Sequence, residues 1–310
     1  AVDVDQGDWP DGPSISARRR EIVAAPSYRS IPTHSRFSRQ ICGSLRLNRT
    51  MQGTVMGAQL TLVAHYGPKP PGLARHINQV LAAIAASEVG RYFQPHCLEQ
   101  IHATIVGLER VPAEIDVIDN LNEYAATGRR RAMELACALK LARRLPPLTI
   151  RFGGFEPEDR RIESFGRPPY VRSFQLHIAQ GNATIIGWHH RDGDFRHADE
   201  LWALRRRFHE QCGARPKYAA DSDFFMTLGT LVDLPPSGSR AGIDLAVAAA
   251  AVEERIRRQI ADRPVDVVVS AEDLAVVRYQ TRDLTPTTST TYPVLDPSLT
   301  ATTLAQLYAG

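Results

Sequence analysis

Residues 101–109 read Ile101-His-Ala-Thr-Ile-Val-Gly-Leu-Glu109, and apolar and polar side chains alternate from the first of them. The apolar residues at positions 101, 103 and 105 fall on one face of a strand, and His102 and Thr104 fall on the other. An imidazole can move a proton near neutral pH, and a threonine hydroxyl can hydrogen-bond a phosphoryl oxygen. Because a His-x-Ser/Thr triplet arises by chance about once in a chain with this many histidines, its context decides its meaning.

Length and composition indicate a globular chain. The 310 residues are 43% hydrophobic and 23% charged, which suffices for one large domain or two small ones. The net charge of +3 is too small to imply nucleic-acid binding by itself. No apolar run reaches the roughly 20 residues of a membrane span, so no membrane association is expected. The cysteines lack zinc or CxxC spacing and are interpreted as buried or free thiols in a reducing compartment. They are Cys42, Cys97, Cys137 and Cys212.

Residues 1–55 differ from the rest of the chain. Between Gly12 and Thr50 there are eight arginines and a single acid, Glu21, with no sustained hydrophobic period. We expect a disordered segment in a cytoplasmic protein. The alternative is that this Arg- and Ser-rich stretch directs import into an organelle. A chain beginning at Met56 is expected to fold with nearly unchanged thermal stability.

Strand and helix patterns fill the remainder. They predict one α+β domain over residues 56–296 and a C-terminal tail at 297–310. Besides the His102 strand, strands are expected at 59–65, 148–155, 173–179, 183–188, 223–231, 265–269 and 274–279. Helices are expected at 73–86, 115–145, 198–212 and 244–261, with a short one at 298–307.

The order of these elements repeats. In the first half a strand and a helix lead to His102-Ala-Thr104, and in the second half the strand at 183–188 and the helix at 198–212 lead to Phe225-Met-Thr227. This order and the first triplet resemble the 2H phosphoesterase superfamily, which includes bacterial RNA 2',5'-ligases and RNA cyclic phosphodiesterases. The resemblance covers roughly residues 58–294.

The resemblance implies a bilobal fold in which two antiparallel sheets line a groove and helices lie outside. It implies hydrolysis of a nucleotide or RNA-end phosphodiester of the 2',3'-cyclic or 2',5' type, with no metal and no cofactor. One imidazole takes a proton from the attacking water or hydroxyl, another protonates the leaving oxygen, and two hydroxyls hold the phosphoryl oxygens. His102 and Thr104 match the first motif, and Thr227 matches the hydroxyl of the second. We expect a monomer whose ligand is a nucleotide or RNA end.

Phe225 departs from this pattern, because it stands where the family has its second histidine. A phenyl ring cannot transfer a proton, and losing an essential acid or base removes roughly 10²–10⁴ in rate. Three hypotheses remain open. The protein recruits a substitute group, or it is a catalytically degenerate relative that binds a nucleotide, RNA end or protein partner without turnover, or it does different chemistry in the same groove.

Asp223 is the best local substitute, since it shares a strand face with Phe225 and Thr227. It would act as a base or orient His102. The plainer interpretation is that Asp223 is a solvated acid at the start of the strand. Four histidines are weaker candidates, each more often partly buried or solvated: His65, His177, His189 and His190. A run of arginines expected to point largely outward from helix 198–212 would steer phosphates or form a solvated face. It consists of Arg205, Arg206 and Arg207.

Overall fold

The structure is a computed structural model that describes residues 57–112 and 117–308. The sequence predictions for residues 1–55 therefore lie outside the described residues. The strands are β1 (Gln59–Ala64), β2 (Phe93–Pro95), β3 (Ala103–Gly107), β4 (Leu148–Phe152), β5 (Phe174–His177), β6 (Asn182–His189), β7 (Phe224–Leu231), β8 (Val265–Val269), β9 (Leu274–Tyr279) and β10 (Ser289–Pro293). The helices are α2 (Pro71–Ala85), α3 (Leu121–Thr127), α4 (Leu135–Arg143), α5 (Pro169–Ser173), α6 (Glu200–Cys212), α7 (Arg240–Ala261) and α8 (Ala301–Gln306).

The fold is α+β, as predicted, and its strands form one antiparallel sheet. The hydrogen-bonded order is β10-β9-β1-β3-β7-β6-β4-β8, with β2 pairing with β7 and β5 with β6. This corrects the prediction of two separate sheets. The two halves meet at β3 and β7, where the register names a single backbone pair, Ala103 and Met226. Both residues are fully buried, so the junction lies in the protein interior.

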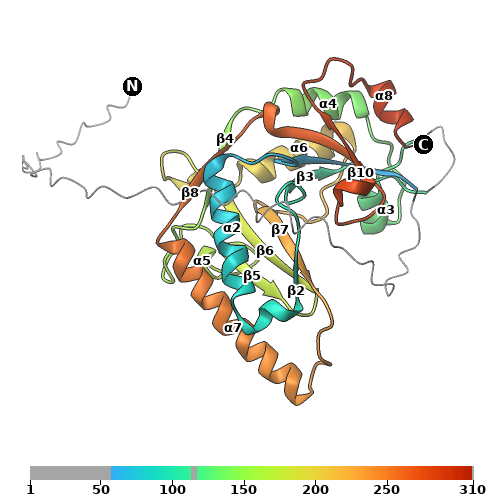
Figure 1. Cartoon of the computed structure of the whole chain (residues 1–310). Helices are drawn as coiled ribbons and strands as arrows, with labels where there is room; N and C mark the ends of the chain where they lie inside the picture. The colour runs from blue at the N-terminus through green and yellow to red at the C-terminus, as the bar shows by residue number, and fades with distance from the viewer. Residues whose placement is uncertain (1–56, 113–116, 309–310) are drawn as a thin grey trace, which may run out of the picture.

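The main helices pack against one face of this sheet. Two of them, α2 and α6, contact the half of the sheet to which the strand before them does not belong. Helix α2 follows β1 of the first half but contacts β8 and α7, whereas α6 follows β6 of the second half but contacts β3 and α4. Figure 1 shows α2 and α7 together along one half and α4 with α6 over the other. Apolar residues of all four helices and of the sheet form one continuous core, so each half depends on a helix supplied by the other.

The long helix predicted at 115–145 is two helices. Asn120 caps α3 by accepting a hydrogen bond from the Glu123 amide, and Gly128 ends it in the left-handed conformation with φ of 69°. Helix α4 follows and is tied to the end of α6 by a disulfide between Cys137 and Cys212, with Cα atoms 5.4 Å apart. The prediction that these two cysteines are thiols is therefore wrong.

The C-terminal segment packs on the domain. Arg143 of α4 donates hydrogen bonds to the carbonyls of Val294, Asp296 and Leu299. Tyr308 is buried, and its hydroxyl donates to the Leu108 carbonyl. Within the part of the chain that the structure describes, no helix is long and apolar enough to cross a membrane.

Candidate functional site

The two sequence triplets meet at the junction between the halves of the sheet. The antiparallel pair Ala103–Met226 joins their middle residues. Continuing this register puts His102 opposite Thr227 and Thr104 opposite Phe225. Because cross-strand partners point to the same side of a sheet, these four side chains share one face. We call it the His102 face, and it lies opposite the helices.

Burial along the strands agrees with this assignment. Thr104 is exposed, and His102, Phe225 and Thr227 are partly exposed. The residues between them, Ala103 and Met226, are fully buried in the helix-covered core. The alternation noted in the sequence is therefore present in both strands, and the polar groups gather on the face without helices.

His102 is held as a neutral base. Its Nδ1 lies 2.6 Å from the Gln100 carbonyl oxygen, so Nδ1–H donates and Nε2 keeps a lone pair. The Tyr66 ring packs against it with centroids 5.7 Å apart. The pKa of His102 is lowered to about 4, chiefly by desolvation; the hydrogen bond to Gln100 opposes this effect, and the charges of Lys69 and His96 add to it.

His96 is a second imidazole beside His102, and the sequence analysis missed it. Strand β2 pairs with β7 as far as Pro95 and Gly229, and the His96 amide then donates to the Leu228 carbonyl at 2.9 Å. The pKa of His96 is lowered by desolvation, while the charge of Asp283 and a hydrogen bond to the Thr227 backbone raise it. The only signal in the sequence is a short Phe-Gln-Pro segment just before it.

Further polar groups lie on the loops that follow strands β1 and β9. Lys69 donates to the Gly67 carbonyl at 2.7 Å, and desolvation lowers the pKa of its amine to about 8. The Gln100 amide group donates to the Asp283 carbonyl at 2.6 Å. Desolvation acts to raise the pKa of the Asp283 carboxyl, but hydrogen bonds from threonine hydroxyls and the charge of His96 lower it overall. We call Lys69, His96, His102, Thr227 and Asp283 the His102 cluster.

Asp223, the predicted substitute, has other partners. It is 2% exposed. Trp188 donates to one carboxylate oxygen at 2.8 Å. The other oxygen accepts from Ser164 at 2.8 Å and from Arg172 at 2.5 Å. Both oxygens are thus engaged in a buried network that fixes the start of β7, which argues against the proton-transfer role predicted for this residue.

Phe225 belongs to a small aromatic cluster next to this network. It packs against residues that include Phe155, Ile186 and Trp188. The rings of Phe155 and Trp188 are in edge contact with centroids 5.2 Å apart. Position 225, where the resemblance would put a second histidine, therefore holds an apolar side chain in apolar surroundings.

The other candidate histidines have partners of their own. His65 Nδ1 lies 3.6 Å from Asp273, and its ring meets Phe224 on the buried side. His177 Nε2 lies 3.4 Å from the Thr184 hydroxyl. The last two are paired with carboxylates 3.0 and 3.1 Å away, as His189 with Glu200 and His190 with Asp266. These contacts give structural roles to the four weaker candidates.

Arg205 corrects the expectation of an outward arginine run. It is 5% exposed and donates to backbone carbonyls on both sides of the junction. The acceptors are Thr104 at 2.9 Å, Ile105 at 3.1 Å, Asp221 at 2.7 Å and Asp223 at 3.1 Å. Arg206 and Arg207 are exposed as expected. The guanidinium of Arg205 thus bridges β3 and the start of β7 where direct strand pairing ends.

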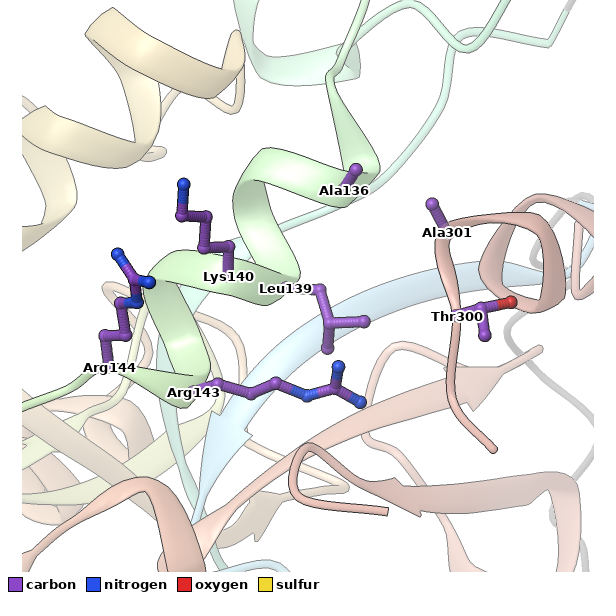
Figure 2. A pocket seen from close by; sticks show the side chains of 7 residues that line it. All are labelled: Ala136, Leu139, Lys140, Arg143, Arg144, Thr300 and Ala301. Carbon is purple, nitrogen blue, oxygen red and sulfur yellow. The ribbon is translucent and has the colours of Figure 1, made fainter. Parts of the chain in front are cut away.

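In the part of the chain that the structure describes, neither a metal site nor a separate pocket provides a second candidate site. Among the described residues, no group of three or more His, Cys, Asp or Glu is arranged to hold a metal ion. A pocket of about 360 Å³ lies between α4 and α8. Figure 2 shows Leu139 and Arg143 extending from α4 toward Thr300 and Ala301, whereas Lys140 and Arg144 point away from them. It shares no lining residue with the His102 cluster, and Arg143 is engaged with carbonyls of the C-terminal segment.

Comparison with known proteins gives distant likenesses. No protein-family model and no curated protein matches this chain. The crystal structure of TT0787 of Thermus thermophilus is 18% identical with a TM-score of 0.34, over 75% of this chain and 93% of that one. A crystal structure described as a phosphoesterase is 14% identical with a TM-score of 0.33, over 77% and 95%. Likenesses of this size assign no function, so function is inferred from the residues of this chain.

Proposed function

We propose that this chain is a phosphodiesterase of the 2H type that hydrolyses a nucleotide or RNA-end phosphodiester, either 2',3'-cyclic or 2',5'. The observation that carries the proposal is the Ala103–Met226 pair, which brings the two triplets into register. His102, Thr104 and Thr227 then share one sheet face, which supports three of the four groups that the family mechanism uses; the fourth position holds Phe225. The protein acts as a monomer on a nucleotide or RNA end.

The chemistry follows from the state of His102. Its Nδ1–H is engaged by the Gln100 carbonyl, so Nε2 is the atom that accepts a proton from the attacking water. The hydroxyls of Thr104 and Thr227 donate hydrogen bonds to the phosphoryl oxygens, whose charge grows in the transition state. Lys69 adds a positive charge next to His102 and offsets the negative charge of a bound diester.

The alternative is a protein that binds a phosphorylated ligand without turnover. The observation that favours it is Phe225, which provides no proton donor in the second triplet and packs in an aromatic cluster. Under this alternative Thr104, Thr227 and Lys69 still bind the phosphate. The two functions therefore differ in turnover and agree in binding.

The test measures hydrolysis of 2',3'-cyclic nucleotides and of RNA with a 2',3'-cyclic end. We expect turnover by the wild type and a loss of roughly 10²-fold or more in kcat/KM for His102→Ala. His197→Ala is the matched control, because this side chain is 43% exposed and lies outside the His102 cluster. Calorimetric binding of a nucleoside monophosphate without any turnover would support the binding protein. Turnover that survives His102→Ala would contradict the proposed site.

A further inference from the structure

The chain carries a second imidazole at the junction of the triplets, although it does not come from the second triplet. We propose that His96 is the general acid of the reaction, protonating the leaving oxygen while His102 takes the proton of the attacking water. This inference rests on the proposed function and names a residue that the two triplets do not contain.

The first argument is the path of the chain between the two histidines. Residues 97–101 form a single turn in which the Cys97 carbonyl accepts hydrogen bonds from the amides of Gln100 at 3.0 Å and Ile101 at 3.3 Å. His96 enters this turn and His102 leaves it. A turn closed in this way brings the two histidines close together, although they are six residues apart in the sequence.

The second argument is the strand that both histidines border. The His96 amide donates to the Leu228 carbonyl of β7. The register of β3 sets His102 opposite the preceding residue, Thr227. His96 and His102 therefore occupy neighbouring positions along the same edge of β7, about one residue step apart. Neighbouring positions of a regular strand would face opposite sides, but His96 lies beyond the end of β2, where its ring forms a hydrogen bond with the Thr227 backbone and acts on His102 through its charge. Thr227, the hydroxyl of the second triplet, borders both positions.

Glycine at 229 permits this arrangement. A Cβ atom at that position would lie 2.4 Å from the Gln94 carbonyl oxygen and 2.7 Å from the Phe93 ring. Only a residue without a side chain lets β2 approach β7 closely enough to pair. The pairing ends at Pro95, and the next residue is His96.

The charges around the two rings assign their roles. Desolvation lowers the pKa of His96, and the carboxylate of Asp283 that this ring faces acts against desolvation and favours the protonated form. His102 instead faces the ammonium of Lys69 and the ring of Tyr66, and the charge of Lys69 favours its neutral form. Glu99 and Cys97 act on Lys69 from the same turn. A bound diester anion stabilises a cationic imidazole, and the ring beside Asp283 is the one that becomes protonated.

The proton balance closes with water as the only co-reactant. The water oxygen attacks phosphorus as its proton passes to Nε2 of His102. The bond from phosphorus to the ribose oxygen breaks, and that oxygen takes the proton from His96. The product is a phosphate monoester with a free hydroxyl, and the two histidines exchange one proton through solvent to restore the starting state.

His177 is the competing imidazole and serves as the control. It lies on β5, and β6 separates β5 from β7. Its strand is therefore about 10 Å from β7, at the usual spacing of about 4.8 Å between neighbours. His177 is partly buried like His96, so His177→Ala is matched in residue type and exposure.

The experiment compares two leaving groups in wild type, His96→Ala, His102→Ala and His177→Ala. A ribose hydroxyl, released from a 2',3'-cyclic nucleotide, must be protonated as it leaves, whereas p-nitrophenolate, released from a p-nitrophenyl nucleotide diester, leaves without a proton. We expect His96→Ala to lose roughly 10²-fold or more on the cyclic substrate and less than about tenfold on the p-nitrophenyl ester. His102→Ala should lose activity on both, and His177→Ala on neither.

Imidazole rescue separates proton transfer from folding. Added imidazole should restore part of the activity of His96→Ala on the cyclic substrate, with an unchanged melting temperature before and after addition. Equal losses on both substrates, or wild-type activity in His96→Ala, would overturn the role of His96 while leaving the proposed function standing. A wild type inactive on every diester would overturn both.

Asp283 is a positioning residue for His96, and its test is the pH profile. Asp283→Asn keeps the imidazole but removes the charge that raises its pKa. The acid then deprotonates at lower pH, so the alkaline limb of kcat/KM on the cyclic substrate should move to lower pH. An alkaline limb that stays in place would remove Asp283 from the mechanism.

Discussion

His76 is a histidine that the fold keeps neutral. It is 3% exposed on α2, its Nε2 has no hydrogen-bond partner, and its ring lies against Phe152. Burial lowers its pKa from 6.5 to about 4. The unfolded chain therefore binds a proton near pH 6.5 that the folded chain does not bind until about pH 4. Stability from this residue is lost as the pH falls through that window.

The prediction concerns His76→Leu. Between pH 7 and about 4.5, the free energy of unfolding of the wild type should fall by about 2 kcal/mol more than that of the variant, at about 1.36 kcal/mol per pH unit. Urea denaturation at both pH values measures this difference. His197→Ala, at a far more exposed position, should keep the wild-type dependence. If His76→Leu had the same pH dependence of stability as the wild type, this would contradict the conclusion that His76 is kept neutral.

At this scale the sequence predicts some of the side chains that lie on the His102 face and misses others near them. Period-two alternation is local, and it correctly sets His102 and Thr104 apart from their apolar neighbours. The neighbours of Asp223 come from three separate segments, including Trp188 and Arg172, which no local pattern relates. His96 is missed for the same reason, because a three-residue strand pairs with β7 more than a hundred residues away.

Arg205 stabilises the junction between β3 and the start of β7 through its hydrogen bonds to both. Arg205→Met should lower the free energy of unfolding by about 3–5 kcal/mol, because it leaves several buried carbonyls and the carboxylate of Asp221 without their partner. Denaturant titration measures the loss. Arg206→Met is the control, since its side chain is exposed and pairs with Glu210 at 3.7 Å, worth less than about 0.5 kcal/mol. Similar losses in both variants would contradict the role of Arg205.

Gly229 links strand packing to the His102 cluster. Gly229→Ala should cost about 1–3 kcal/mol of stability, because the added Cβ collides with the backbone of β2. It should also displace His96 and lower kcat/KM on a cyclic nucleotide by more than the unfolded fraction explains. Gly72→Ala is the control, where the nearest atom to a new Cβ is 3.5 Å away. Full activity in a folded Gly229→Ala would contradict the link.

Element positions follow from local signals where those signals are strong. The helix predicted at 198–212 is found at Glu200–Cys212, because its apolar stripe and the following glycine are both local features. Helix α7 starts before the predicted Asp244, since Ser239 caps it by accepting from the Gly242 amide. The break inside 115–145 is missed because Gly128 ends α3 within an otherwise helical composition.

The disulfide between α4 and α6 constrains the whole molecule. It closes a loop across a sequence separation of 75 residues, for which the entropy of the unfolded chain predicts a stabilisation of about 4 kcal/mol. Adding reductant should therefore lower the melting temperature of the wild type. The double variant Cys137→Ser/Cys212→Ser should melt at the lower temperature with or without reductant. Cys97→Ser is the control and should keep the wild-type response. A wild type whose melting temperature does not change on adding reductant would contradict the disulfide.

The α+β class could be predicted from the sequence because it depends on the order of local patterns. The joining of both halves into one sheet could not, since it depends on one backbone pair between residues 103 and 226. The exchange of α2 and α6 between halves is likewise a long-range packing choice, made by the shared core. No periodicity within either half encodes it.

The pair between Ala103 and Met226 relates the two triplets by a local two-fold axis, as any antiparallel pair does. If both triplets were identical, a diester lying on that axis would meet the same groups from either end and would have no preferred direction. Histidine at 102 and phenylalanine at 225 break this symmetry. The site therefore has a head and a tail, and under the proposed function that polarity sets which of the two ester oxygens of a bound diester departs.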